Sequence, residues 1–177
     1  MKTLSQLKAL PFFLGAFLVS SVALAQMGKP QASPRDSVSG TVAGSAIKIA
    51  YGSPAVKGRK IWGGLVPYDK VWRTGANPVT TFETSKDIQI EGKTLPAGKY
   101  SLFTTPGETE WKVIFNSQLG QWGIKNDGSA NDDPSKDVLV VTVKSMKSKE
   151  FNERLTFKIH NGFVLLWENL AVPVKIK

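Results

Sequence analysis

The sequence predicts an all-β protein, a single antiparallel β-sandwich of jelly-roll-like architecture with about nine to eleven short strands. Apolar and polar residues alternate with a period of two over most of the chain after residue 36. No segment of that part places apolar residues at helical spacing, and glycine- or proline-containing turns separate the alternating runs. The length of 177 residues suits one such domain.

The first 25 residues have the organisation of a secretory signal peptide. Lys2 and Lys8 form a basic lead, an apolar run follows from residue 9 to residue 18, and small residues end at Ala25. Two serines stop this run short of the roughly 20 apolar residues that a membrane-spanning helix needs. We therefore expect cleavage and an exported protein, periplasmic or extracellular, with no integral membrane span once the leader is removed.

The rest of the chain divides into a short linker and one folded domain. Residues 26–36 contain two prolines and a glycine among polar residues and show no periodicity, which predicts a linker. The alternating pattern then continues to the last residue. We therefore assign residues 37–177 to the β-sandwich domain.

The amino-acid composition excludes several classes of catalytic and metal site. The chain has no cysteine and a single histidine, which excludes disulfides, thiol nucleophiles, iron–sulfur clusters and multi-histidine metal sites. We predict no cofactor and no metal. Lysine and arginine number 23 against 14 acidic residues, and loss of the leader lowers the net charge from +9 to +7. Outside the inner membrane this excess serves solubility or favours a glycan or anionic envelope component over nucleic acid. The oligomeric state stays open.

Each alternating run predicts one strand with a buried and a solvated face. The runs that carry this pattern are residues 46–51, 87–91, 110–116, 154–160 and 172–177. Residues 137–143 differ because they are apolar on both faces, which predicts a central strand.

Turn residues support these strands. Asn161-Gly162 lies between two alternating runs and predicts a type I′ hairpin, in which both central residues have positive φ. Glu91-Gly92 predicts a second tight hairpin, and Pro106-Gly107 occupies the central positions of a predicted type II turn. Residues 95–98, Leu-Pro-Ala-Gly, predict a turn led by proline.

Two long segments interrupt the strand pattern. Residues 52–78 are rich in glycine and proline yet contain large aromatic side chains, and residues 120–136 are mostly polar. Long loops on β-sandwiches often carry binding sites. The second loop holds four carboxylate or amide side chains, Asp127, Asn131, Asp132 and Asp133. Their spacing matches no calcium-binding loop, and a solvated turn is the preferred interpretation.

Several segments carry a family resemblance. They are residues 53–60 (SPAVKGRK), 64–68 (GLVPY), 71–77 (VWRTGAN), 95–102 (LPAGKYSL), 111–116 (WKVIFN), 121–123 (QWG) and 167–169 (WEN). Together these motifs closely resemble exported bacterial proteins grouped as domain of unknown function 2911. The resemblance implies export and a β-rich single domain. It implies no activity, so no catalytic residue is transferred from it.

The most promising constellation lies in the two irregular segments. The candidate ligand-binding residues are Arg59, Trp62, Tyr68, Arg73, Asn77 and Trp122, with Lys57 and Trp72 beside them. Aromatic faces stack on sugar rings, guanidinium groups bind carboxylate or phosphate through paired donors, and asparagine both donates and accepts hydrogen bonds. In the structural alternative Tyr68 and Trp72 belong to the core, and Arg73 is a buried anchor that pairs with a carboxylate such as Glu83.

Three functions remain open at this stage. The preferred one is a non-enzymatic envelope module that binds a carbohydrate-containing or anionic ligand. The second is a glycan hydrolase that uses two carboxylates, for which Glu83 and Glu168 are conceivable. The third is a structural or partner-binding subunit. The chain has no nucleophile elbow and no complete phosphate loop, and its only histidine, His160, is expected on a polar strand face.

Overall fold

The computed structural model describes residues 32–177, which form ten β-strands and one 3₁₀ turn, with no α-helix among them. The predicted leader and the first part of the predicted linker lie outside the described residues. The elements are β1 (Arg35–Val42), β2 (Ser45–Gly52), β3 (Thr80–Thr84), β4 (Ile88–Ile90), β5 (Lys93–Leu95), β6 (Gly98–Thr105), β7 (Glu110–Asn116), η1 (Pro134–Lys136), β8 (Asp137–Lys144), β9 (Met146–His160) and β10 (Gly162–Lys175). The all-β, antiparallel prediction is confirmed.

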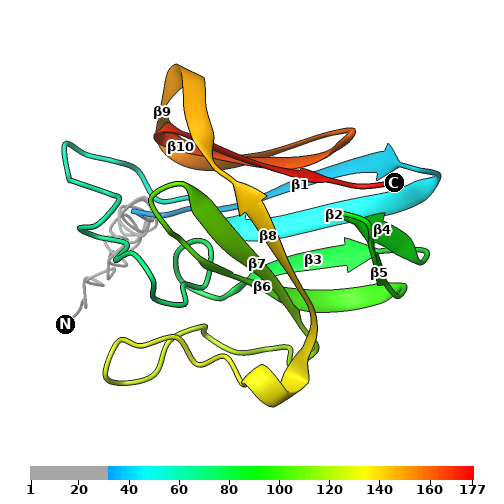
Figure 1. Ribbon diagram of the computed structural model, residues 1–177. Helices are drawn as coiled ribbons and strands as arrows, with labels where there is room; N and C mark the ends of the chain where they lie inside the picture. Colours follow the sequence, from blue (N-terminus) through cyan, green and yellow to red (C-terminus); the bar gives the residue numbers. More distant parts are fainter. Residues whose placement is uncertain (1–31) are drawn as a thin grey trace, which may run out of the picture. The chain divides into compact units, whose positions relative to one another are not determined.

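The strands form two layers, consistent with a sandwich. Six of them make one antiparallel sheet in the order β1-β2-β3-β6-β7-β8. The long β9–β10 hairpin lies over one face of this sheet (Figure 1). The short β4–β5 hairpin joins the end of β10, because Gln89 and Lys177 exchange backbone hydrogen bonds of 2.8 and 2.9 Å. The six-stranded order is nearly sequential, so it lacks the Greek-key crossovers of the predicted jelly roll.

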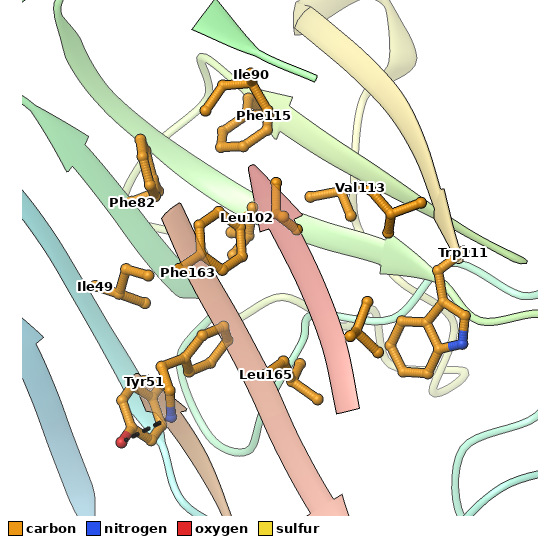
Figure 2. Close-up of a cluster of buried hydrophobic side chains, with 14 of the residues drawn as sticks. Ile49, Tyr51, Phe82, Ile90, Leu102, Trp111, Val113, Phe115, Phe163 and Leu165 are labelled. Atoms are coloured by element: carbon orange, nitrogen blue, oxygen red, sulfur yellow. Dashed lines mark hydrogen bonds between the residues drawn. The ribbon is translucent and has the colours of Figure 1, made fainter. Parts of the chain in front are cut away.

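The core fills the space between the six-stranded sheet and the β9–β10 hairpin. Phe163 of β10 packs against Phe82 of β3, with ring centroids 5.7 Å apart, and Phe82 meets Phe115 of β7 edge-on at 5.1 Å (Figure 2). The predicted alternation is confirmed in β2, where Ile47 and Ile49 are buried and the residue between them is exposed.

Tyr51 fastens the two layers together at one corner. Its hydroxyl donates to Asp36 Oδ2 at 2.9 Å. It also accepts from the backbone N–H of Phe157 at 3.3 Å, a hydrogen bond drawn as a dashed line in Figure 2. These contacts connect β1, β2 and β9. Burial and the neighbouring Asp36 carboxylate raise the pKa of Tyr51 to about 12, so the phenol stays protonated and can donate.

Residues 137–143 form β8 as predicted, but β8 is an edge strand and not a central one. Leu139, Val141 and the third alternate residue, Val143, face the core, whereas Val138 and Val140 are 43% and 36% exposed on the other face. The apolar residues on both faces suggested a central strand, but within the described part of the chain the outer side of β8 is left exposed at these two positions.

Of the predicted turns, the Glu91-Gly92 hairpin is confirmed, whereas the turn types predicted for Asn161-Gly162 and Pro106-Gly107 are wrong. Glu91 and Gly92 have φ of 49° and 82°, so both central residues have the positive φ of a type I′ turn. At the other hairpin only Gly162 has positive φ, and His160 pairs directly with Gly162, which leaves Asn161 alone in the turn. Gly107 is not in the positive-φ region that a type II turn requires. Glycine is needed there because a Cβ would lie 2.4 Å from the Glu110 carbonyl oxygen.

The first strand begins at Arg35, two residues before the predicted domain boundary. Arg35 pairs with Gly52, and the Ser53 N–H donates to the Pro34 carbonyl at 2.9 Å. The start of β1 shows no apolar alternation because it lies at the sheet edge with exposed side chains. Backbone pairing alone therefore extends the sheet into the segment predicted as linker.

Candidate functional site

The VWRTGAN segment, residues 71–77, is irregular but firmly held against the sheet. Trp72 and Thr104 of β6 exchange backbone hydrogen bonds of 2.7 and 2.9 Å. Thr74 is fully buried, its hydroxyl lies 3.1 Å from that of Thr104, and its carbonyl accepts from the Thr80 hydroxyl at 2.8 Å. The segment therefore has a fixed position relative to β3 and β6.

Two residues of this segment adopt left-handed backbone conformations. Thr74 has a φ of 57° and Asn77 a φ of 61°. The left-handed region is costly for a β-branched residue such as threonine, and it persists only where the surroundings impose it. The Asn77 side chain adds a tether by donating from Nδ2 to the Ser33 carbonyl at 2.9 Å. Such strain clusters at functional sites in proteins, which makes this segment the leading candidate.

A cleft of about 850 Å³ opens between residues 70–77 and the loop 124–132. Trp72 and Trp167 supply aromatic surface to it, and their rings stack with centroids 6.0 Å apart and planes 16° apart. The charged side chains that line it are Arg59, Lys70, Arg73, Lys125, Asp127 and Asp132. Four cations face two carboxylates, so the cleft suits an anion.

Among the four cations of the cleft, Arg73 is the one that is half-buried; Arg59, Lys70 and Lys125 are exposed. The Arg73 guanidinium makes only two long hydrogen bonds, to the carbonyls of Gly75 at 3.4 Å and Trp122 at 3.5 Å. No carboxylate of residues 32–177 lies within 4.0 Å of it. Burial lowers its pKa from the ordinary value, because the charged form loses hydration. The predicted pairing with Glu83 is wrong, since Glu83 Oε2 lies 4.0 Å from Lys99 Nζ instead.

Arg59 lines the same cleft but also ties its own loop. Nε donates to the Val56 carbonyl at 3.0 Å, and Nη2 donates to the Ala55 carbonyl. The side chain is exposed, and three of the five N–H donors of its guanidinium are not used in these two hydrogen bonds. Arg59 therefore lines the cleft and also has a structural role.

Trp62 does not line the cleft. It is 8% exposed and lies in the core at the centre of four tryptophans, 5.0 Å from Trp111, 5.6 Å from Trp167 and 6.0 Å from Trp72 between ring centroids. The indole N–H groups of Trp62, Trp111 and Trp167 are buried with no hydrogen-bond partner among residues 32–177. Trp62 stabilises the floor beneath the cleft.

Tyr68 and Trp122 are also outside the cleft. Tyr68 packs against the core beside Gly63, as the structural alternative predicted. Trp122 is 55% exposed and lines a smaller groove on the other side of the segment 121–125. The structure therefore brings Arg59, Arg73 and Asn77 together at one cleft and separates Trp62, Tyr68 and Trp122 from it.

The acidic residues of the described part of the chain lie apart from any metal cluster, and the two conceivable carboxylates lie outside the cleft. No group of three histidine, cysteine or acidic side chains in the described part of the chain could hold a metal ion. The exposed Asp127 accepts from the hydroxyl and the N–H of Ser129, which lowers the pKa of its carboxyl. Glu83 and Glu168 line neither the cleft nor the groove.

Comparison with known proteins adds a family. The family model described as protein of unknown function (DUF2911) matches residues 33–176. The chain belongs to this family. No curated protein and no solved structure matched the chain. Within residues 32–177 no helix is long and apolar enough to cross a bilayer.

Sequence reasoning missed three side chains of the cleft. Trp167 lies on the buried face of β10, so its periodicity indicates a core residue. It is indeed 1% exposed, although it also lines the cleft. Lys70 and Lys125 are single exposed lysines without a motif. The family motifs at residues 71–77 and 167–169 would have indicated the Trp72–Trp167 side of the cleft if the two motifs had been assumed to lie next to each other in the fold.

Proposed function

We propose that this DUF2911 protein is exported to the cell envelope and acts there as a non-enzymatic module that binds a carbohydrate-containing or anionic ligand in the cleft beside VWRTGAN. Arg73 is the observation that supports this most directly. A half-buried guanidinium with no nearby carboxylate loses hydration without gaining an ion pair, and an entering anion restores the missing interaction.

The rest of the cleft supports the same ligand class. Arg59, Lys70 and Lys125 line the cleft together with Arg73, and Trp72 supplies aromatic surface to the same cleft. A sugar ring packs its C–H groups on such a face while an acidic substituent reaches the cations. The volume of about 850 Å³ is within the range of small-molecule sites.

Ligand binding is tested by thermal unfolding of the full chain as the cell processes it, with glucose 6-phosphate as the probe and glucose as its neutral counterpart. A ligand that binds the native state raises the melting temperature, by an amount equivalent to about 2.7 kcal/mol at 100 times Kd. Lys125→Gln removes an exposed cleft cation, and Lys112→Gln removes an exposed cation of β7 as the matched control. We expect only Lys125→Gln to reduce the shift, and added salt to reduce it as well.

Recognition of the anionic group is refuted if glucose 6-phosphate and glucose give equal shifts of the melting temperature, or if Lys125→Gln behaves like Lys112→Gln. The whole ligand class is refuted if neither compound raises the melting temperature. Export has its own test, which is the mass of the protein recovered from the cell envelope or the medium. Cleavage after Ala25 predicts a chain that begins at Gln26. An uncleaved chain confined to the cytoplasm would contradict the proposal.

A further inference from the structure

A second hollow lies on the face of the six-stranded sheet opposite the β9–β10 hairpin. It is a groove of about 340 Å³ between strands β1, β3 and β6 and the segment 119–122. Thr81 and Lys99 project into it from β3 and β6, alternating with Phe82 and Tyr100, which point into the core. The segment 121–125 separates this groove from the cleft, because Gln121 and Trp122 line the groove while Ile124 and Lys125 line the cleft.

The apolar surface of the groove is unusual for this chain. Trp122 is 55% exposed, whereas the other tryptophans take part in the core cluster. Leu119 is 47% exposed and lines the same groove. Large apolar side chains gathered in one exposed hollow indicate a contact surface.

The polar side chains around Trp122 have an excess of positive charge. Arg35 and Lys99 line the groove, and Glu83, which lies 4.0 Å from Lys99, is the carboxylate beside them. Within residues 32–177 the Arg35 side chain makes one long hydrogen bond, 3.5 Å to the Pro78 carbonyl, which uses one of its five donors. The buried Oε1 of Gln121 accepts no hydrogen bond from residues 32–177.

The central strands β3 and β6 cannot pair with a partner through their backbones. β3 is paired on one side with β2 and on the other with β6, and β6 is paired with β3 and β7. Their backbone N–H and C=O groups are therefore used within the sheet, and an extended peptide cannot be added beside them as a further strand. A ligand that lies over β3 and β6 is bound through side chains.

We propose that the groove binds a sugar ring of an acidic oligosaccharide, with the ring stacked on Trp122 and its carboxylate bound by Arg35 and Lys99. A sugar presents an apolar C–H face together with polar groups at its rim, which matches an indole surface beside two cations. The volume of about 340 Å³ lies at the small end of ligand sites, as expected for one ring or two. This site is distinct from the proposed cleft, and the two are tested with different variants.

The test uses the full-length gene product and tetragalacturonate as the acidic probe, with maltotetraose as the neutral comparison, by titration calorimetry. We expect tetragalacturonate to bind more tightly than maltotetraose. Trp122→Ala should weaken it about five- to ten-fold, and Trp122→Phe should retain most of the affinity because a flat face remains. Arg35→Gln should weaken tetragalacturonate binding and leave any maltotetraose binding unchanged.

Fluorescence gives an independent measurement. Because Trp122 is the most exposed tryptophan, bound tetragalacturonate should reduce acrylamide quenching in the wild type, and this protection should disappear in Trp122→Phe while calorimetry still detects binding. Melting curves of both Trp122 variants show that the fold is retained. No binding, unchanged affinity in Trp122→Ala, or equal affinity for both tetrasaccharides would overturn the proposal. Loss of binding in Lys125→Gln but not in Trp122→Ala would overturn it in favour of the cleft.

Discussion

The backbone of Gly123 packs closely against the Arg73 side chain, and a substitution at Gly123 tests how much this packing contributes to stability and to ligand binding. Gly123 has a φ of 92°, and an added Cβ would lie 2.7 Å from Arg73 Cβ, 2.9 Å from Arg73 Cδ and 3.2 Å from Val79 Cβ. Gly128 lies in the same loop with a φ of 82° and nothing within 4 Å of an added Cβ. Alanine at the two positions therefore meets similar backbone strain and very different space.

The magnitudes follow from this difference. A left-handed conformation costs an L-residue about 1–2 kcal/mol, partly offset in the unfolded chain, so Gly128→Ala should lose about 1 kcal/mol. Overpacking adds about 1–3 kcal/mol, so Gly123→Ala should lose about 3 kcal/mol. For a chain of this size the two melting temperatures should fall by about 2–4 °C and about 6–12 °C.

Thermal and urea unfolding followed by tryptophan fluorescence compares the two variants directly. Gly123→Ala should also weaken glucose 6-phosphate binding, because the new Cβ would be too close to Arg73 Cβ and Cδ. Relief of this clash requires a shift of the Arg73 side chain or of the backbone around residue 123. Gly128→Ala should bind nearly as well as the wild type. Equal destabilisation by the two substitutions would refute the packing argument, since it would mean that backbone strain is the whole effect.

Two further predictions concern the fold that supports the cleft. Tyr51→Phe removes a buried acceptor from the Phe157 N–H and should cost about 1–3 kcal/mol. The folded pKa of Tyr51, about 12, is above its ordinary value near 10, so its contribution to the free energy of unfolding is complete below pH 10 and is lost towards pH 12. Urea unfolding at pH 9 and at pH 11.5 should therefore show that the wild type loses more of its free energy of unfolding between these pH values than the variant does. Gly52→Ala places a Cβ 1.9 Å from the Ala76 carbonyl oxygen and should prevent native folding. Gly92→Ala, whose added Cβ has nothing within 4 Å, should fold. A native circular dichroism spectrum for Gly52→Ala would contradict this prediction.

Most of the architecture was predictable because it depends on local information. The alternation of Ile47 and Ile49 with exposed residues needs only a strand with one buried face, and Glu91-Gly92 needs only a turn that accepts positive φ at both residues. The position of β8 was not predictable in this way. Val138 and Val140 carry the same periodic signal as a central strand, and only the sheet order shows that their face is uncovered.

The candidate site was predicted in part, for a related reason. Arg59, Arg73 and Asn77 do meet at one cleft, but Trp62 and Trp122 are equally plausible aromatic residues in the sequence and have opposite environments. Trp62 is buried because β10 brings Trp167 next to it, a contact between residues more than a hundred positions apart. Loop composition identifies residue types that can bind a ligand, whereas burial of each one depends on such long-range contacts.

The same long-range contacts explain why the irregular segments can hold fixed side chains. The four tryptophans under the cleft form a rigid floor, and the hydrogen bonds of Thr74 to Thr104 and Thr80 hold its strained backbone against β3 and β6. Strain of this kind persists only when several independent contacts impose it. Arg73 extends from this fixed backbone, so under the proposed function a ligand would meet a side chain whose stem is already positioned, and less entropy would be lost on binding. A half-buried guanidinium with no carboxylate within 4.0 Å among residues 32–177 costs stability, and an anion bound as proposed would offset that cost.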